Sequence, residues 1–224
     1  IPPESAKLQA LAELNRTLVW RAADATTTTA TIDHDGTIIE SHKRDARVAY
    51  EGTRGYQPLV ALWAEEQLVV ADEFRDGNVA GGEDPLRSAR RAFDTLPPTV
   101  TTRYFRGDSA DYYDPLLKYL VGENIGFAIS ADMSPELRAV CTGQPEGAWQ
   151  ELETRERERV DLAEVEFTPG VWPKDANPLR YIALRFTPLQ AELFAGVAVR
   201  YHAVVSNRHA LTPAAVIEWH RGKA

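Results

Sequence analysis

The stretch from Thr27 to Ile39, TTTATIDHDGTII, decides the fold that we expect for this chain. It is rich in β-branched residues, which favour extended backbone, and it contains Asp35-Gly36, a pair of the kind that reverses a chain between two strands. We therefore predict a strand that turns at this pair into a second strand. Because side chains alternate along a strand, Asp33 and Asp35 are predicted to lie on the same face.

The segments on both sides of this stretch alternate between helical and extended patterns. An N-terminal helix is predicted from Pro3 to about Ala23, where apolar residues recur at helical spacing. Beyond the stretch, the same criteria predict strands at Pro58–Trp63, Gln67–Phe74, Val100–Arg106 and Ile125–Ser130, and helices at Pro85–Leu96 and Asp114–Val121. This order predicts an α/β fold with a mixed sheet flanked by helices.

The pattern changes after Ser134, and we predict an inserted segment there. It contains a short helix at Pro135–Val140 and the charge-rich stretch Glu151–Glu166. Strands are predicted to follow at Arg180–Phe186 and Val197–Val205, and a helix runs from Thr212-Pro213 through His220. The predicted organisation is an N-terminal helix at 1–26, the first part of a core at 27–132, the insertion at 133–178 and the last part of the core at 179–224.

The composition of the 224 residues excludes several classes of protein. With 44% hydrophobic and 26% charged residues, the chain is neither disordered nor collagen-like, and no apolar run is long enough to span a membrane. The single cysteine, Cys141, excludes a disulfide framework and a zinc site built on paired thiolates. The net charge of −8 argues against unaided binding of nucleic acid, although the tail from Arg200 to Ala224 is predominantly basic.

Two acidic clusters are candidates for chemistry. Asp33 and Asp35 would repel each other on one face of a strand unless a cation or proton lay between them, and hard divalent metals suit such a site. The alternative is a hairpin turn at Asp35-Gly36 with a solvated acid beside it. Asp108 follows a predicted strand in Arg106-Gly107-Asp108-Ser109, where an aspartate could also cap a helix. If the two strands are neighbours, the clusters converge at one edge of the sheet.

Short tracts in a fixed order resemble DDE transposases of the insertion-sequence type, whose catalytic core is RNase-H-like and carries an insertion. The tracts are Asp33-His34-Asp35-Gly36-Thr37, Gly55-Tyr56-Gln57-Pro58-Leu59, Arg75-Asp76-Gly77-Asn78, Arg106-Gly107-Asp108-Ser109 and Tyr201-His202-Ala203-Val204-Val205-Ser206-Asn207-Arg208. The tail Glu218-Trp219-His220-Arg221-Gly222-Lys223 is similar to the start of the helix that leads to the family's final glutamate. The resemblance covers nearly the whole chain.

The resemblance implies an enzyme that cleaves DNA strands and transfers them by in-line phosphoryl transfer with two Mg²⁺ (or Mn²⁺) ions. Its implied catalytic and metal-binding residues are Asp35, Asp108 and Asp33, and its implied DNA-binding residues are Arg208, Arg221 and Lys223. Transposon ends and target DNA are the implied partners, with a homodimer or larger assembly in the active complex and no membrane. The implied location is the prokaryotic cytoplasm, in association with the nucleoid.

The family's third acid is missing from the expected place. It follows the basic tail by a few residues, so we expect it beyond Ala224, and the fragment itself is expected to be inactive. Glu218 is the nearest acid, but it precedes the basic pair. The only methionine is Met133, which also indicates part of a longer protein.

Two alternatives remain open. Asp33-His34-Asp35-Gly36-Thr37 also fits the nucleophile motif of haloacid-dehalogenase-type phosphatases, in which Asp33 would attack phosphate and Asp35 would act as the acid. That family's later lysine and acidic pair are absent from the expected positions. The second alternative is a catalytically inactive, transposase-derived module that binds DNA or assembles with partners without cutting.

Overall fold

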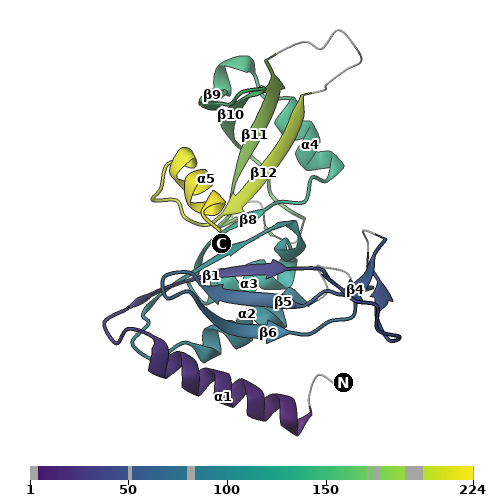
Figure 1. Cartoon of the computed structure of the whole chain (residues 1–224). Helices are drawn as coiled ribbons and strands as arrows, with labels where there is room; N and C mark the ends of the chain where they lie inside the picture. The colour runs from purple at the N-terminus through teal and green to yellow at the C-terminus, as the bar shows by residue number, and fades with distance from the viewer. Residues whose placement is uncertain are drawn as a thin grey trace. The chain divides into compact units, whose positions relative to one another are not determined.

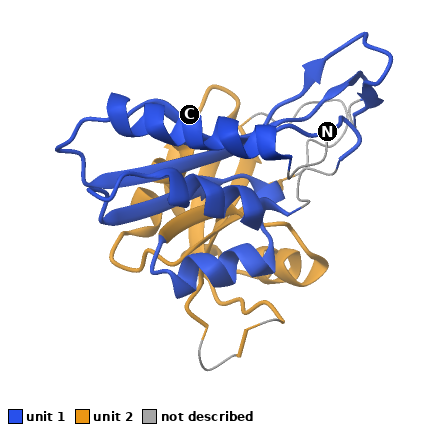
Figure 2. Cartoon of the chain, turned by 90° about the horizontal axis from the view of Figure 1, so that it is seen from below, with its two compact units in different colours: residues 1–125, 223–224 blue, residues 126–222 orange. Residues whose placement is uncertain are grey.

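The computed structural model describes residues 5–49, 52–79, 84–170, 172–173, 177–189 and 199–223. The chain forms two compact units (Figure 2). Unit 1 comprises residues 1–125 with 223–224, and unit 2 comprises residues 126–222.

The main sheet of unit 1 is mixed, as the sequence predicts. Its strands are β1 (Thr29–Gly36), β5 (Leu59–Trp63), β6 (Leu68–Glu73) and β7 (Thr102–Gly107), in the order β6-β5-β1-β7 (Figure 1). β1 pairs antiparallel with β5 and parallel with β7, and β5 pairs antiparallel with β6. The first strand is therefore central, and the strand after the first crossover helix lies beside it. The parallel pairing of β1 with β7 brings the ends of these two strands to the same edge of the sheet.

The predicted reversal at Asp35-Gly36 is wrong. Asp35 pairs with Val60 and Gly36 with Leu59, so β1 stays extended through this pair. A neighbouring strand was available to complete the hydrogen bonds of the extended backbone, and this outweighed the turn preference of Asp-Gly. The chain then forms a separate small sheet that the sequence analysis missed, β2 (Ile39–Glu40), β4 (Arg54–Tyr56) and β3 (Arg47–Val48), in the order β2-β4-β3.

The helices of unit 1 follow the sequence prediction closely. They are α1 (Ala6–Ala22), α2 (Pro85–Thr95) and α3 (Asp114–Gly122), with a short 3₁₀ turn η1 (Ser109–Asp111) between β7 and α3. Ser5 caps α1 by accepting a hydrogen bond from the amide of Leu8, and proline lies in the first turn of α2 and of α3. Apolar side chains from sheet and helices fill the core: Ile32, Trp63, Phe105, Leu116, Leu117 and Leu120 are all fully buried.

Unit 2 contains an antiparallel sheet in the order β8-β12-β11-β10-β9. Its strands are β8 (Gly126–Ser130), β9 (Gln150–Thr154), β10 (Glu158–Val165), β11 (Arg180–Pro188) and β12 (Arg200–Ser206). Its helices are α4 (Pro135–Thr142), the 3₁₀ turn η2 (Glu146–Ala148) and α5 (Pro213–Arg221). Of the strand predicted at Val197–Val205, residues 197 and 198 lie outside the described residues.

The charge-rich stretch from Glu151 to Glu166 forms most of β9 and all of β10. Val160 and Leu162 are buried, and between them Asp161 is buried with the guanidinium of Arg185 3.0 Å from its carboxylate. The strand signal was hidden because charged residues in this sheet are paired rather than solvated. β10 pairs along its length with β11, which follows the segment 133–178. The assignment of 133–178 as an insertion stays a prediction.

Among the described residues, no helix is both long and apolar enough to cross a membrane.

Cys141 is expected to be inert in the folded protein. Its side chain is fully buried on α4, and burial raises the pKa of the thiol to about 11. The thiolate is the reactive form, so at pH 8 only about one thiol in a thousand would be ionised. We expect Cys141 of the folded protein not to react with an aromatic disulfide reagent. After denaturation each chain should release one equivalent of the aromatic thiolate, which is measured by its absorbance. Rapid labelling of the native protein would contradict this assignment.

Candidate functional site

A pocket of about 210 Å³ lies at the edge where β1 and β7 end. Eight residues line it, Asp35, Gly36, Gln57, Leu59, Asp108, Ser109, Ala110 and Asp111. They come from the end of β1, the start of β5 and the turn after β7, segments that are far apart in the sequence. Three of the eight are aspartates, so the pocket concentrates negative charge.

Asp35 and Asp108, the two acids on which the sequence interpretation depends, both line this pocket. Asp35 is exposed and is the second-last residue of β1. Asp108 is also exposed and is the N-cap of η1, where one carboxylate oxygen accepts a hydrogen bond of 2.8 Å from the amide of Ala110. The second oxygen of Asp108 is not used by this cap. The parallel pairing of β1 with β7 is what brings the two acids to one edge.

Asp33 does not line the pocket. It is buried, and its carboxylate accepts two hydrogen bonds from Arg106, at 2.6 Å from Nε and 2.8 Å from Nη2. Asp33 and Arg106 are register partners on the parallel strands β1 and β7. Both carboxylate oxygens are therefore committed to a buried, bidentate ion pair, the strongest geometry for this pair of side chains.

Asp111 is a lining residue that the sequence analysis missed. One of its oxygens lies 2.7 Å from Nδ1 of the fully buried His34, whose Nε2 is 3.0 Å from the hydroxyl of Ser88. Burial raises the pKa of Asp111, and the charge and hydrogen bond of His34 oppose that rise. Gly107 allows this packing, because a Cβ there would lie 2.2 Å from an Asp111 oxygen. In the sequence, the glycine directly before Asp108 was the available signal that another side chain packs closely against this turn.

Gln57 contributes an unusual polar atom to the pocket. The residue is only 7% exposed, and its side-chain oxygen has no hydrogen-bond partner among the described residues. A buried acceptor without a partner costs free energy, so such an atom calls for an explanation. Because Gln57 is one of the lining residues, this oxygen is a candidate acceptor or ligand for a group in the pocket. Gln57 belongs to the tract Gly55–Leu59, but sequence reasoning gave it no role.

The three cations assigned to DNA have partners within the protein. The guanidinium of Arg208 lies 4.2 Å from the ring centre of Trp219, and Nη1 of Arg221 lies 2.8 Å from a carboxylate oxygen of Glu153. Lys223 Nζ lies 3.1 Å from Oδ1 of Asp35, so its ammonium group supplies positive charge at the pocket. Glu218, the acid nearest the tail, is exposed on α5.

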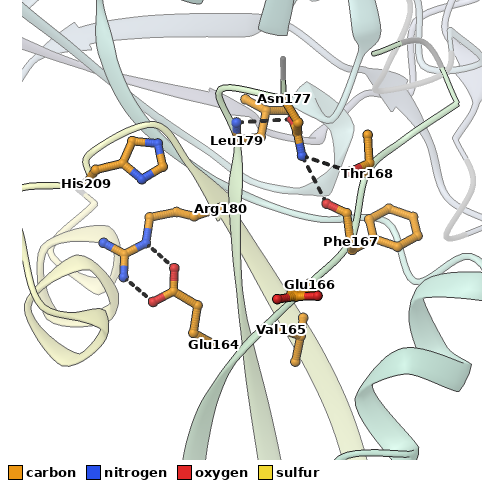
Figure 3. Close-up of a pocket in the computed structure, with 9 residues that line it drawn as sticks. All are labelled: Glu164, Val165, Glu166, Phe167, Thr168, Asn177, Leu179, Arg180 and His209. Carbon is orange, nitrogen blue, oxygen red and sulfur yellow. Dashed lines mark hydrogen bonds and ion pairs between the residues drawn. The ribbon is translucent and has the colours of Figure 1, made fainter. Parts of the chain in front are cut away.

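A larger pocket, of about 850 Å³, lies in unit 2 (Figure 3). Two of its charged side chains, Arg180 and Glu164, are paired with each other. Arg180 forms a bidentate pair with Glu164, at 2.9 and 2.5 Å, and also donates to the backbone oxygens of Arg208 and Leu211. His209 Nε2 lies 2.9 Å from the backbone oxygen of Pro178. Glu166 also lines this pocket, exposed and without an ion pair among the described residues. We place the candidate site in unit 1 because the pocket there contains Asp35 and Asp108.

No protein-family model matches the sequence, and no curated protein matches it. The structure is similar to that of piggyBac transposase, solved by cryo-EM as a synaptic complex with hairpin DNA, with a TM-score of 0.48 and 10% sequence identity over 98% of this chain. The chain spans 45% of the length of that transposase chain. Among the described residues, no three His, Cys, Asp or Glu side chains form a ready metal site.

Proposed function

We propose that this chain is the catalytic core of a DDE transposase of the insertion-sequence type, which cleaves DNA strands and transfers them by metal-dependent phosphoryl transfer. The observation that carries the proposal is the pocket shared by Asp35 and Asp108. These are the acids that the sequence resemblance assigns to catalysis. Transposon ends and target DNA are the proposed substrates, and a homodimer or larger assembly is the proposed active form.

The residues of the pocket fit a hard divalent cation. Mg²⁺ prefers oxygen ligands and is commonly held by one or two carboxylates together with water and substrate phosphates. Asp35 and Asp108 supply exposed carboxylates, although Oδ1 of Asp35 also lies 3.1 Å from Lys223 Nζ. Gln57 supplies a side-chain oxygen that lacks a partner among the described residues. When bound, two such ions activate the attacking oxygen and stabilise the leaving oxygen.

We assign Asp33 a positioning role instead of a ligand role. Its two oxygens are already held by Arg106 in a buried pair, and moving them to a metal would leave the guanidinium without its counter-charge. The pair fixes the register of β1 against β7, which keeps Asp35 and Asp108 on one edge. Asp111, held by His34, supports the turn that presents Asp108.

The phosphatase alternative has less support. It needs Asp33 as an exposed nucleophile, whereas the residue is 3% exposed and ion-paired. The inactive module remains the relevant competitor, since it would share the fold and the DNA but not the chemistry. The distinguishing experiment is Mg²⁺-dependent cleavage of duplex DNA carrying transposon ends by the full-length natural protein that contains this chain, because the fragment alone is expected to be inactive. The full-length protein is compared with its Asp35→Asn and Asp108→Asn variants.

Metal binding gives a test that does not require turnover. We expect Asp35→Asn and Asp108→Asn each to weaken Mn²⁺ binding at least about tenfold, because each removes a charged oxygen ligand while keeping the side-chain shape. The measurement is a Mn²⁺ titration followed by electron paramagnetic resonance. Asp132→Asn is the matched control, because Asp132 is exposed in unit 2 and its substitution removes the same charge. Equal affinity in all four proteins would remove the pocket from metal binding.

A further inference from the structure

The small sheet β2-β4-β3 belongs to an arm, described at residues 37–49 and 52–56, that lies between β1 and β5 in the chain, beside the candidate site. Gly36 directly precedes the arm and Gln57 directly follows it, and both residues line the pocket. Figure 1 shows β4 beyond the ends of β5 and β6 and not stacked on a face of the main sheet. Whatever enters the pocket therefore passes next to the base of this arm.

Backbone contacts and one arginine fix the shape of the arm. Arg54 donates from Nε and Nη2 to the backbone oxygen of Ala46, at 3.2 and 2.9 Å, and from Nη2 to that of Arg44 at 3.1 Å. Gly55 allows close strand contact, because a Cβ there would lie 2.3 Å from the backbone oxygen of Ile39. The backbone of the loop that Arg54 holds is thus preorganised.

Those outward side chains are predominantly basic. Lys43, Arg44 and Arg47 are exposed, together with His42, and the exposed acids in the described part of the arm are Glu40 and Asp45. The three cationic side chains make no ion pair or hydrogen bond within the described part of the chain. This differs from Arg208, Arg221 and Lys223, whose charged groups contact an aromatic ring or carboxylates.

We propose that the arm binds the phosphate backbone of duplex DNA next to the strand held in the pocket, an inference that rests on the proposed function. Lys and Arg contacts to phosphate supply most of the sequence-independent affinity for DNA. In a chain of net charge −8 this affinity has to come from a local basic surface. Lys43, Arg44 and Arg47 form such a surface, and the fixed loop reduces the entropy lost when they bind.

The experiment compares Lys43→Gln/Arg44→Gln/Arg47→Gln with the natural protein in binding a fluorescein-labelled, mixed-sequence duplex of about 30 base pairs, by fluorescence anisotropy over a salt series. The matched control is Lys7→Gln/Arg91→Gln/Lys118→Gln, which removes the same charge from exposed positions elsewhere in unit 1. We expect the arm variant to bind at least about tenfold more weakly and to lose about 3 from the slope of log affinity against log salt. The control is expected to keep both values.

The outcomes separate this inference from the proposed function. If the arm variant binds like the control while the natural protein binds DNA and Mn²⁺, the arm assignment is overturned and the proposed function stands. If the natural protein binds neither DNA nor Mn²⁺, both are overturned. Exposed Ile39 and Val48 could instead make the arm a contact between copies of this chain. Unchanged DNA affinity with altered mass in analytical ultracentrifugation would establish that outcome and overturn the inference.

Discussion

Replacing Asp108 by asparagine is expected to lower the rate of Mg²⁺-dependent DNA cleavage at least about a thousandfold, equivalent to about 4 kcal/mol of transition-state stabilisation. The reason is that a neutral amide cannot replace a carboxylate that holds a cation against the charge of a transferring phosphate. Asparagine caps helices about as well as aspartate, so the hydrogen bond from the amide of Ala110 can be kept. The loss should therefore be chemical and not a loss of folding.

The measurement is the initial rate of strand cleavage by the natural protein, with Asp108→Asn and Asp132→Asn assayed under the same conditions. Asp132→Asn should cleave at the natural rate, because Asp132 is exposed in unit 2 and belongs to no proposed site. Circular dichroism of both variants should overlay that of the natural protein. Cleavage by Asp108→Asn at more than about a tenth of the natural rate would leave the aspartate without a catalytic role.

The positions of the main strands and helices of unit 1 were predictable because their signals are local. Apolar periodicity and proline in the first turn defined α2 and α3 to within two residues, and short apolar runs defined β5 and β6 similarly. The sharing of one pocket by Asp35 and Asp108 was also anticipated, because it follows from placing two strands side by side. Such inferences need only the order of elements and the alternation of side chains.

What the sequence did not reveal depends on partners distant in the chain. The sequence interpretation assigned Asp33 to metal binding together with Asp35. Only the register of β1 with β7 shows that the carboxylate of Asp33 is paired with Arg106. Asp111 and His34 are 77 positions apart, so no local pattern joins them. The short strands of the arm were missed because a run of two or three residues has no periodicity to detect.

Disrupting the buried ion pair between Arg106 and Asp33 is expected to produce the largest change in the free energy of unfolding. Arg106→Ala should lower the free energy of unfolding by about 3–5 kcal/mol, because it leaves a carboxylate buried without its counter-charge. The arginine and aspartate side chains are only 8% and 2% exposed, so water cannot solvate the remaining charge without local opening. Arg155→Ala is the control, since Arg155 pairs with Glu153 at an exposed site and should cost less than about 1 kcal/mol.

A second variant separates loss of the ion pair from loss of packing. Asp33→Asn/Arg106→Leu removes both charges, so it should recover a substantial part of the stability that Arg106→Ala loses, as measured by urea denaturation of the three proteins. If the double variant is at least as stable as the natural protein but cleaves DNA slowly, the pair acts by holding β1 and β7 in register, which aligns Asp35 with Asp108. If Arg106→Ala is as stable as Arg155→Ala, the carboxylate of Asp33 is not held by Arg106, and Asp33 returns to consideration as a metal ligand.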